Sequence, residues 1–368
     1  MGQSPNKLIL PVGLESANDG NVIVESPMPE MQRLLSLFQT FYGPKETHAH
    51  LSNVIDLWDV APKFVSTDRR EAGQDGDCLD RTFEWRRKPY RLRVEPATLT
   101  RTDGSSYRLL PTGREELVEA SLRKIALLPG HGIVATEGGL TVIGVRFSQS
   151  MLRREMGRLG HGITYENLIE SLTVLSHCRV GIAPSGELLG IQQSPMLSAL
   201  GWVNRADWHA NRDALWSAHF HPMVSAALAT FDYRQFDHDQ VMSYRFALTR
   251  WLHRHMASDC RNAGIMHPVK ILLSSAIANS GLLNHARLRD SAGAMEDALE
   301  EMKSSKRNPV RTYERIPVME CRKLADVQYV IHPSLEFIGM SKAANRRQTD
   351  ARESDHPRNK RKIRYRWL

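Results

Sequence analysis

One pattern occurs twice in the chain: two short amphipathic helices joined by a glycine-containing turn and followed by segments with the composition of strands. The first copy covers residues 147–193 and the second covers residues 274–338. Helix, turn, helix and β-ribbon is the element order of a winged helix, whose second helix lies in the major groove of DNA while the ribbon contacts phosphates. The sequence therefore predicts an α+β fold with two tandem winged-helix domains.

In the first copy, a hydroxyl residue stands where each helix is expected to begin. Ser148 and Thr164 precede segments with apolar residues at helical spacing, and both residue types are favoured N-caps. Strands are expected at 179–183 and 188–193, on either side of a Pro-Ser-Gly-Glu turn. The basic and acidic residues of this copy balance, which suits packing or dimerisation better than DNA binding.

The second copy has its own start and stop signals. Gly281 is placed to end its first helix, and Asp290 and Ser291 compete as N-cap of its second helix. The expected elements, including a long helix ahead of the repeat, are helices at 241–257, 271–279 and 291–302 and strands at 310–316 and 327–338.

Two further local patterns precede the repeats. Alternating apolar residues on either side of Arg86-Arg87-Lys88-Pro89 predict a hairpin. Thr112 and Glu115 have the spacing of a capping box, which predicts a helix with Val118, Leu122 and Ile125 on its buried face.

The domain organisation follows from these elements and from the distribution of charge. From residue 342 onward there are ten Lys and Arg against three acids, whereas the whole chain has a formal net charge of only +8. A basic terminal block often contacts nucleic acid, the alternative being a merely solvated tail. We expect a largely flexible N-terminal region (1–78), a first winged helix (79–235), a second winged helix (236–341) and a basic tail (342–368).

Composition and motifs argue against several other classes. No stretch is apolar enough to span a membrane, and the N-terminus lacks the basic start of a secretory signal. The four cysteines form no CxxC pair and no zinc spacing, so we expect thiols in a reducing cytoplasm. Neither a P-loop nor a dinucleotide-binding GxGxxG motif is present. We expect a cytoplasmic protein that binds no nucleotide cofactor and no metal.

Six segments of the chain carry a resemblance to a known family: residues 57–63, 110–116, 233–237, 248–254, 333–338 and 342–347. Taken in this order, they resemble plasmid replication initiators, the Rep proteins of theta-type plasmids. The resemblance implies that the first winged helix mediates dimerisation and backbone contact, and that the second binds direct repeats (iterons) at the origin. It also implies opening of an adjacent AT-rich region, autorepression, and contacts with host initiator, replicative helicase and sliding clamp, without a cofactor.

The candidate DNA-binding residues cluster around the second repeat. Arg287 and Arg289 precede its second helix, where phosphate or a guanine edge is within reach. Four acids in the body of that helix would repel phosphate, so we expect base contacts from its first turn only. Plain solvation is the alternative for these cations. The full set is Arg287, Arg289, Ser291, Lys303, Lys306, Arg307, Arg311, Arg315, Arg322, Lys323, Arg346 and Arg347.

Three alternatives or additions stay open. The chain could be a transcriptional regulator with no role at an origin. His219-Phe220-His221, with Tyr244 as nucleophile, would suit a metal-dependent nickase, although no acidic third ligand is evident. The segment from Leu34 to Phe38 is similar to the short peptide by which some initiators bind the sliding clamp, but it also fits an ordinary amphipathic segment.

Overall fold

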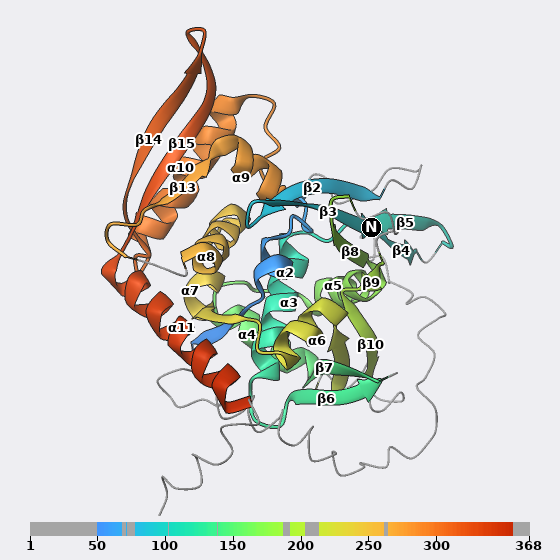
Figure 1. Cartoon of the computed structure of the whole chain (residues 1–368). Coiled ribbons are helices and arrows are strands. Elements are labelled where there is room, and N and C mark those ends of the chain that lie inside the picture. Colours follow the sequence, from blue (N-terminus) through green and yellow to red (C-terminus); the bar gives the residue numbers. More distant parts are fainter. Residues whose placement is uncertain are drawn as a thin grey trace, which may run out of the picture. The chain divides into compact units, whose positions relative to one another are not determined.

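The computed structural model describes residues 50–67, 71, 78–101, 103–137, 139–186, 192–202, 213–260 and 264–355 (Figure 1). The Leu34–Phe38 segment and residues 188–191 of the strand expected at 188–193 lie outside these residues. Residues 192 and 193 are described but are not in a strand. The fold is α+β, with helices and several small sheets, which confirms the expected class. Two compact units divide the described chain: residues 61–222 form unit 1, and residues 50–60 with 223–355 form unit 2.

Unit 1 is built around three helices and two four-stranded sheets. The sheets have the strand orders β2-β3-β8-β9 and β10-β11-β7-β6, and β4 and β5 form a separate pair. The elements are β2 (Leu79–Trp85), β3 (Lys88–Glu95), β4 (Ala97–Thr100), β5 (Ser106–Leu109), α3 (Gly113–Ala126), β6 (Gly132–Glu137), β7 (Leu140–Phe147), α4 (Gln149–Arg158), α5 (Tyr165–His177), β8 (Arg179–Pro184), β9 (Ser194–Pro195), β10 (Leu197–Trp202) and β11 (Trp216–Phe220).

The helix caps predicted from the sequence of unit 1 are present at the starts of α3, α4 and α5. The capping box at α3 is present, and the Glu115 carboxylate accepts the Thr112 N–H at 2.8 Å. Ser148 accepts the N–H of Met151 at 3.1 Å, and Thr164 accepts that of Asn167 at 3.2 Å. These side chains satisfy N–H groups that have no partner within their own helix, which is why α4 and α5 begin where they do.

Unit 2 contains the complete element order of a winged helix: α8, β13, α9, α10 and the hairpin β14–β15. Its sheet has the order β13-β15-β14, and β1 pairs antiparallel with β12. The elements are β1 (Leu51–Val54), α2 (Asp56–Val60), α6 (Pro222–Ala229), β12 (Arg234–Asp237), α7 (His238–Met242), α8 (Ala247–Asp259), β13 (Val269–Leu272), α9 (Leu273–Ser280), α10 (Leu288–Ser304), β14 (Val310–Glu320), β15 (Lys323–Pro333) and α11 (Leu335–Asp355).

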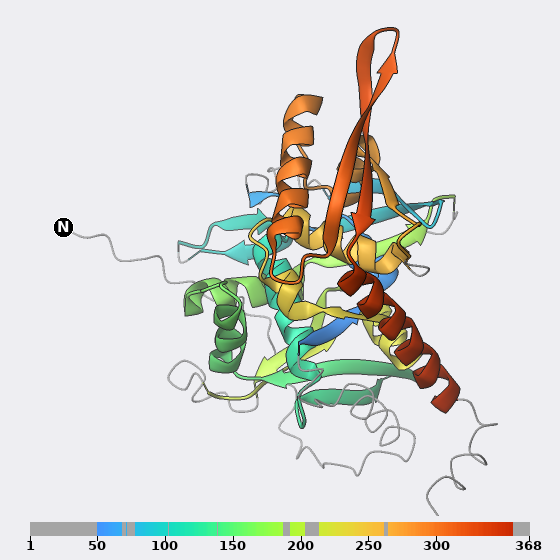
Figure 2. The same ribbon diagram turned by 90° about the vertical axis from the view of Figure 1, so that its left-hand side faces the viewer.

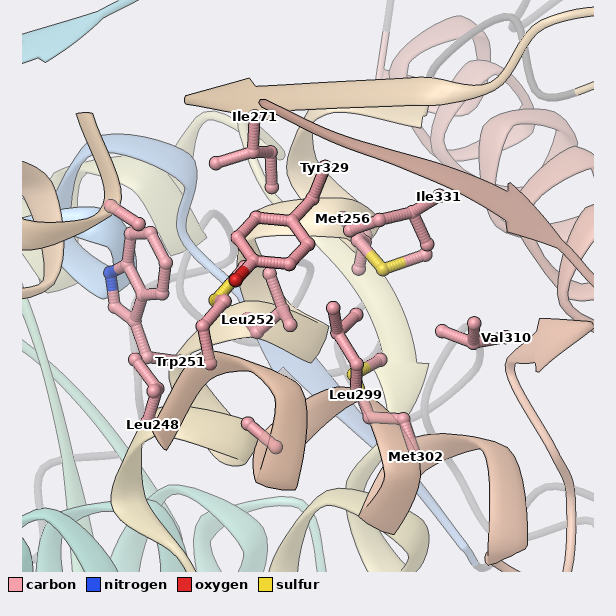
Figure 3. Packing of buried hydrophobic residues seen from close by; sticks show 14 of the residues in the cluster. Leu248, Trp251, Leu252, Met256, Ile271, Leu299, Met302, Val310, Tyr329 and Ile331 are labelled. Atoms are coloured by element: carbon pink, nitrogen blue, oxygen red, sulfur yellow. The ribbon is translucent and has the colours of Figure 1, made fainter. Parts of the chain in front are cut away.

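The core of unit 2 joins α8 and α10 to the sheet (Figure 3). Leu252 and Met256 of α8, Leu299 of α10, and Tyr329 and Ile331 of β15 are all fully buried. The Tyr329 hydroxyl donates to the Ala292 carbonyl at 3.2 Å, so the only polar atom of that side chain is satisfied inside the core. This packing fixes α10 against the wing.

Two helix predictions for unit 2 were wrong at their boundaries. The helix expected at 241–257 is two helices, α7 and α8, separated by residues 243–246. The Glu301 carboxylate accepts the N–H groups of Arg245 and Phe246 in this break. The helix expected at 271–279 begins at Leu273, since the preceding residues pair with β15 as β13. Its expected end is confirmed: Gly281 has a left-handed φ of 65°.

The second helix of the repeat also starts earlier than expected. α10 begins at Leu288 with Arg287 as N-cap, so neither Asp290 nor Ser291 caps it. Leu288 packs against the core, which extends the helix by a turn beyond its local capping signal. Tertiary packing therefore sets this boundary.

The strand expected at 327–338 was wrong at its far end. β15 ends at Pro333, and Ser334 accepts the N–H of Phe337 at 3.1 Å to begin α11. Residues 342–355, expected to belong to a tail, continue this helix. Only residues 356–368 remain as the terminal basic segment, and they lie outside the described residues.

The N-terminal region also contains more structure than expected. Residues 51–60 supply β1 and α2 to unit 2, where Val54 and Trp58 are completely buried. The Trp251 indole donates to the Val60 carbonyl at 3.2 Å. Apolar burial on this scale stabilises a segment of ten residues against the entropy of ordering it. The limits of the two units therefore differ from the expected domain limits.

Candidate nucleic-acid interface

The N-terminal end of α10 carries two arginines, Arg287 and Arg289, together with the exposed acid Asp290. Arg287 and Arg289 are exposed and form no ion pair with any described residue. No side chain accepts the N–H groups of the first turn of α10 from the N-cap position. The positive end of a helix dipole and two guanidinium groups attract phosphate and other anions.

Four acids in the body of α10 would repel the phosphates of DNA. Two of them are engaged in contacts within unit 2. Glu296 accepts the Tyr329 hydroxyl at 3.2 Å and pairs with Arg315 at 3.1 Å, on the wing side of the helix. Glu301 accepts the N–H groups of Arg245 and Phe246, just before α8. Two of the four acids are thus engaged inside unit 2, while Asp297 and Glu300 remain exposed.

The hairpin β14–β15 forms the wing and runs alongside α10. Its turn consists of Cys321 and Arg322, which have positive φ values of 45° and 68°, as a two-residue hairpin turn requires. Within unit 2 the ribbon projects past the helices (Figure 2). Arg311, Arg322 and Lys323 are exposed on it and pair with no described acid.

Two side-chain contacts give the direction of α10 relative to the wing. The ammonium of Lys303, near the helix C-terminus, lies 6.0 Å from the ring centre of Tyr313, and Glu296, two turns earlier, contacts Arg315. The helix therefore runs antiparallel to β14, and its N-terminus points toward the hairpin turn. Arg287 and Arg289 lie at the same end of the unit as Arg322.

Several candidate residues instead stabilise the unit. Arg307 pairs with the buried Asp237 carboxylate at 2.7 Å, where burial raises the carboxyl pKa. Ser291 is buried and cannot reach DNA from this fold, because it lies on the core side of α10. Lys303 pairs with Glu300 at 3.3 Å, and Arg315 with Glu296. Lys306 is exposed.

The last two candidate residues lie on α11. Arg346 is exposed, whereas Arg347 is half-buried, and this burial lowers its pKa. Further along the helix, Arg352 pairs with Asp232 at 2.7 Å. The cations of 342–355 are therefore divided between solvent and internal contacts, which a flexible tail would not produce.

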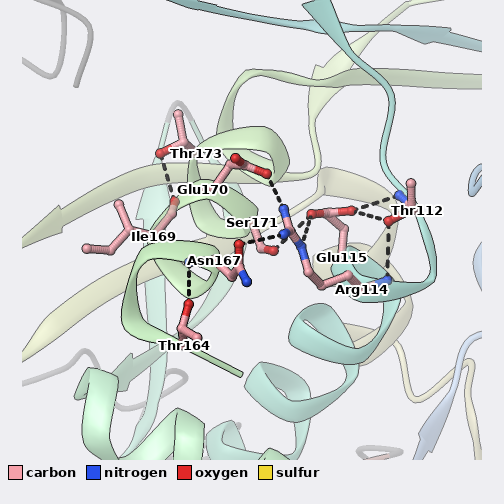
Figure 4. A network of polar contacts seen from close by, with 9 residues as sticks. All are labelled: Thr112, Arg114, Glu115, Thr164, Asn167, Ile169, Glu170, Ser171 and Thr173. Carbon is pink, nitrogen blue, oxygen red and sulfur yellow. Dashed lines mark hydrogen bonds and ion pairs between the residues drawn. The ribbon is translucent and has the colours of Figure 1, made fainter. Parts of the chain in front are cut away.

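The second helix of the first winged helix, α5, is bound into its own unit (Figure 4). The Arg114 guanidinium donates to Asn167 at 3.1 Å and pairs with Glu170, and the Ser171 hydroxyl donates to Glu115 at 2.9 Å. These contacts occupy the polar first turns of α5, which also contain the acidic Glu166. α5 is thus equipped for packing against α3 rather than for contact with phosphates.

One basic cluster in unit 1 stands outside the set of residues expected to bind DNA. Arg86 and Arg87 form the two-residue turn of β2–β3, with φ values of 50° and 61°, and both are exposed together with Lys88. The Arg86 guanidinium lies 4.2 Å from the ring centre of Trp85. The run of three cations is the signal that could have found this cluster, but the sequence argument used it only to predict a hairpin turn.

The residues of the nickase hypothesis are largely buried. Tyr244 is 1% exposed, its Oη lies 3.1 Å from His253 Nδ1, and burial raises its pKa. His221 is also buried, it contacts the Val180 carbonyl at 3.1 Å, and burial lowers its pKa to about 4. A buried phenol of raised pKa is poorly placed to attack a phosphodiester.

In the part of the chain that the structure describes, no helix is both long and apolar enough to cross a membrane. Comparison with family models and with curated proteins gives no match. Among solved structures, domains 2 and 3 of RctB match as a selenomethionine derivative with a TM-score of 0.47 and 11% identity, covering 76% of this chain and 96% of that chain. A second structure of RctB domains 2–3 has a TM-score of 0.44 and 11% identity, covering 77% and 99%.

Proposed function

We propose that the chain is a plasmid replication initiator that binds direct repeats in duplex DNA through unit 2. The observation that carries the proposal is the arrangement of Arg287 and Arg289 at the open N-terminus of α10, at the same end as the turn of a basic wing. The resemblance to plasmid initiators supports the step from DNA binding to replication.

The geometry suits the major groove, which is about 12 Å wide and admits one helix. α10 would enter by its N-terminal turn, where Arg289 reaches a base edge and Arg287 a phosphate. Arginine donates two parallel hydrogen bonds to the O6 and N7 of guanine, the commonest specific contact. The free cations of the wing, Arg311, Arg322 and Lys323, would hold the flanking backbone.

Unit 1 would serve assembly in this proposal. The internal contacts of α5 and the balanced charge of the first repeat favour a protein partner over DNA. A homodimer that represses its own promoter, and a monomer active at the origin, would follow from regulated association. Binding would open an adjacent AT-rich region and recruit host initiator, replicative helicase and sliding clamp, with no cofactor and no catalytic step by this chain.

Footprinting of the full chain on the replicon that encodes it tests the proposal. Protection of several direct repeats beside an AT-rich stretch is the expected result. Protection confined to a single promoter operator would instead identify a transcriptional regulator. Incubation of supercoiled origin DNA with Mg²⁺ or Mn²⁺ provides a separate check, since a covalent adduct at Tyr244 would identify a nickase.

A further inference from the structure

The outer half of the wing exposes a cluster of apolar side chains. Ile316, Val318, Met319 and Leu324 are 42%, 38%, 56% and 40% exposed. Met319 and Leu324 are cross-strand partners directly below the hairpin turn. Neighbouring exposed apolar side chains are unfavourable in water, and the pair Met319 and Leu324 is therefore a candidate contact surface.

The charges around this cluster favour a polyanionic partner. Arg322 is in the turn itself, and Lys323 follows it, while two of the three acids of the hairpin, Asp326 and Glu314, lie farther from the turn and contact other residues of unit 2. Asp326 accepts the N–H of Ser274 at 3.1 Å, and Glu314 lies 3.4 Å from His332. Glu320 is exposed opposite Lys323. The described groups at the turn are therefore apolar residues accompanied by an excess of cations.

The backbone of the turn adds an independent observation. Arg322 has a φ of 68°, a conformation that asparagine and glycine adopt far more readily than a long side chain. An arginine in this position is less stable than a glycine or asparagine would be. The turn places the exposed Arg322 at the end of the ribbon, next to the pair Met319 and Leu324.

We propose that the wing is a DNA wedge: Met319 and Leu324 enter the minor groove and partly unstack a base step, while Arg322 and Lys323 hold the two phosphate backbones. This inference rests on the proposed function and deepens it. The uncovered part of the ribbon, about five residues, extends roughly 16 Å, which exceeds the minor-groove depth of about 7.5 Å. Inserted Leu, Ile, Met and Phe side chains unstack and kink duplex DNA in this way.

The wedge also connects binding to duplex opening. α10 would occupy the major groove at one position, and the wing would reach the adjacent minor groove on the same side of the duplex. Unstacking one step lowers the barrier to melting the neighbouring AT-rich pairs. The energy comes from binding, since the wedge itself needs no nucleotide hydrolysis.

The test uses the full chain and its footprinted duplex, with 2-aminopurine placed at successive steps beside the α10 site. Wild type is expected to raise 2-aminopurine fluorescence at one step. The double variant Met319→Gln, Leu324→Thr is expected to bind roughly tenfold more weakly and to lose the fluorescence increase. Met266→Gln, at a methionine 84% exposed in a loop of the same unit, is the matched control and should behave as wild type.

Three other results of this experiment would overturn the wedge proposal, and they differ in what they mean for the proposed function. Specific binding with an unchanged fluorescence increase in the double variant overturns the wedge and leaves the proposed function standing. Loss of self-association by the double variant, with DNA binding intact, overturns it in favour of a protein interface. Absence of any sequence-specific complex with wild type removes both proposals together.

Discussion

At the scale of single residues, two arginines that are alike in the sequence have different roles in the structure. Arg289 is exposed without an ion pair to any described residue, whereas Arg307 neutralises the buried Asp237. Arg289→Ala should therefore cost about 1–3 kcal/mol of discrimination at one base pair and leave stability unchanged. Competition binding with the footprinted site and random duplex measures this, with Arg158→Ala in unit 1 as control. Equal weakening on both DNAs would make Arg289 a phosphate contact.

Arg307→Ala should instead lower the stability of unit 2. It leaves the buried Asp237 carboxylate without its partner, and we expect unit 2 to lose roughly 1–3 kcal/mol, less than a fully buried pair because Arg307 is 34% exposed. Burial raises the pKa of Asp237, so protonation favours the folded form and the loss of stability in the variant should shrink as the pH falls. Urea unfolding at several pH values measures both. A pH-independent deficit would show that the ion pair is not its cause.

Buried histidines give unit 2 a second pH dependence. Burial lowers the pKa of His253 to about 3, so folding excludes a proton that the unfolded chain binds below about pH 6.5. Stability is therefore present above that value and is lost on acidification, by about 1.4 kcal/mol per pH unit for one such histidine. His253→Gln should flatten this slope between pH 6.5 and 5, measured by hydrogen exchange of α8. Identical slopes in variant and wild type would contradict the argument.

At the scale of elements, α11 separates two roles of the basic C-terminal region. Its buried side includes Phe337 and Ala351, and Ser341 accepts from Arg234 at 2.9 Å. Deletion from residue 342 should therefore destabilise unit 2, whereas deletion of 356–368 should leave its unfolding unchanged. The short deletion removes six cations. The slope of log K for DNA binding against log salt concentration should then become shallower by about 0.9 for each phosphate that these cations neutralise in the wild-type complex. An unchanged slope would show that these residues do not touch DNA.

Elements whose signals are local could be predicted from the sequence, and elements set by tertiary contacts could not. The capping box at Thr112, the caps at Ser148 and Thr164, and the left-handed Gly281 each depend on neighbours within a few residues. The break before α8 depends on Glu301, some 55 residues away in the chain, and the start of α10 depends on packing of Leu288. For the same reason the sequence did not separate Arg307 and Ser291 from the exposed candidates.

At the scale of the whole molecule, the two winged helices have different surfaces. The second helix of unit 1 is bound to α3 by Arg114 and Ser171, while that of unit 2 presents free arginines at its start. These contacts are consistent with the proposal that unit 2 binds DNA while unit 1 serves assembly. Dimerisation through unit 1 stays a prediction, which sedimentation of full-length protein across a concentration range would measure.

Selection of bound sequences from a random duplex pool tests the central claim most directly, because it asks whether α10 reads bases. Full-length wild type is expected to enrich one motif, which recurs as direct repeats in the encoding replicon. The double variant Arg287→Ala, Arg289→Ala is expected to retain binding to the pool but lose the preference at a few adjacent positions. Enrichment of the same motif, to the same extent, by wild type and variant would contradict the claim that the N-terminus of α10 is the reading element.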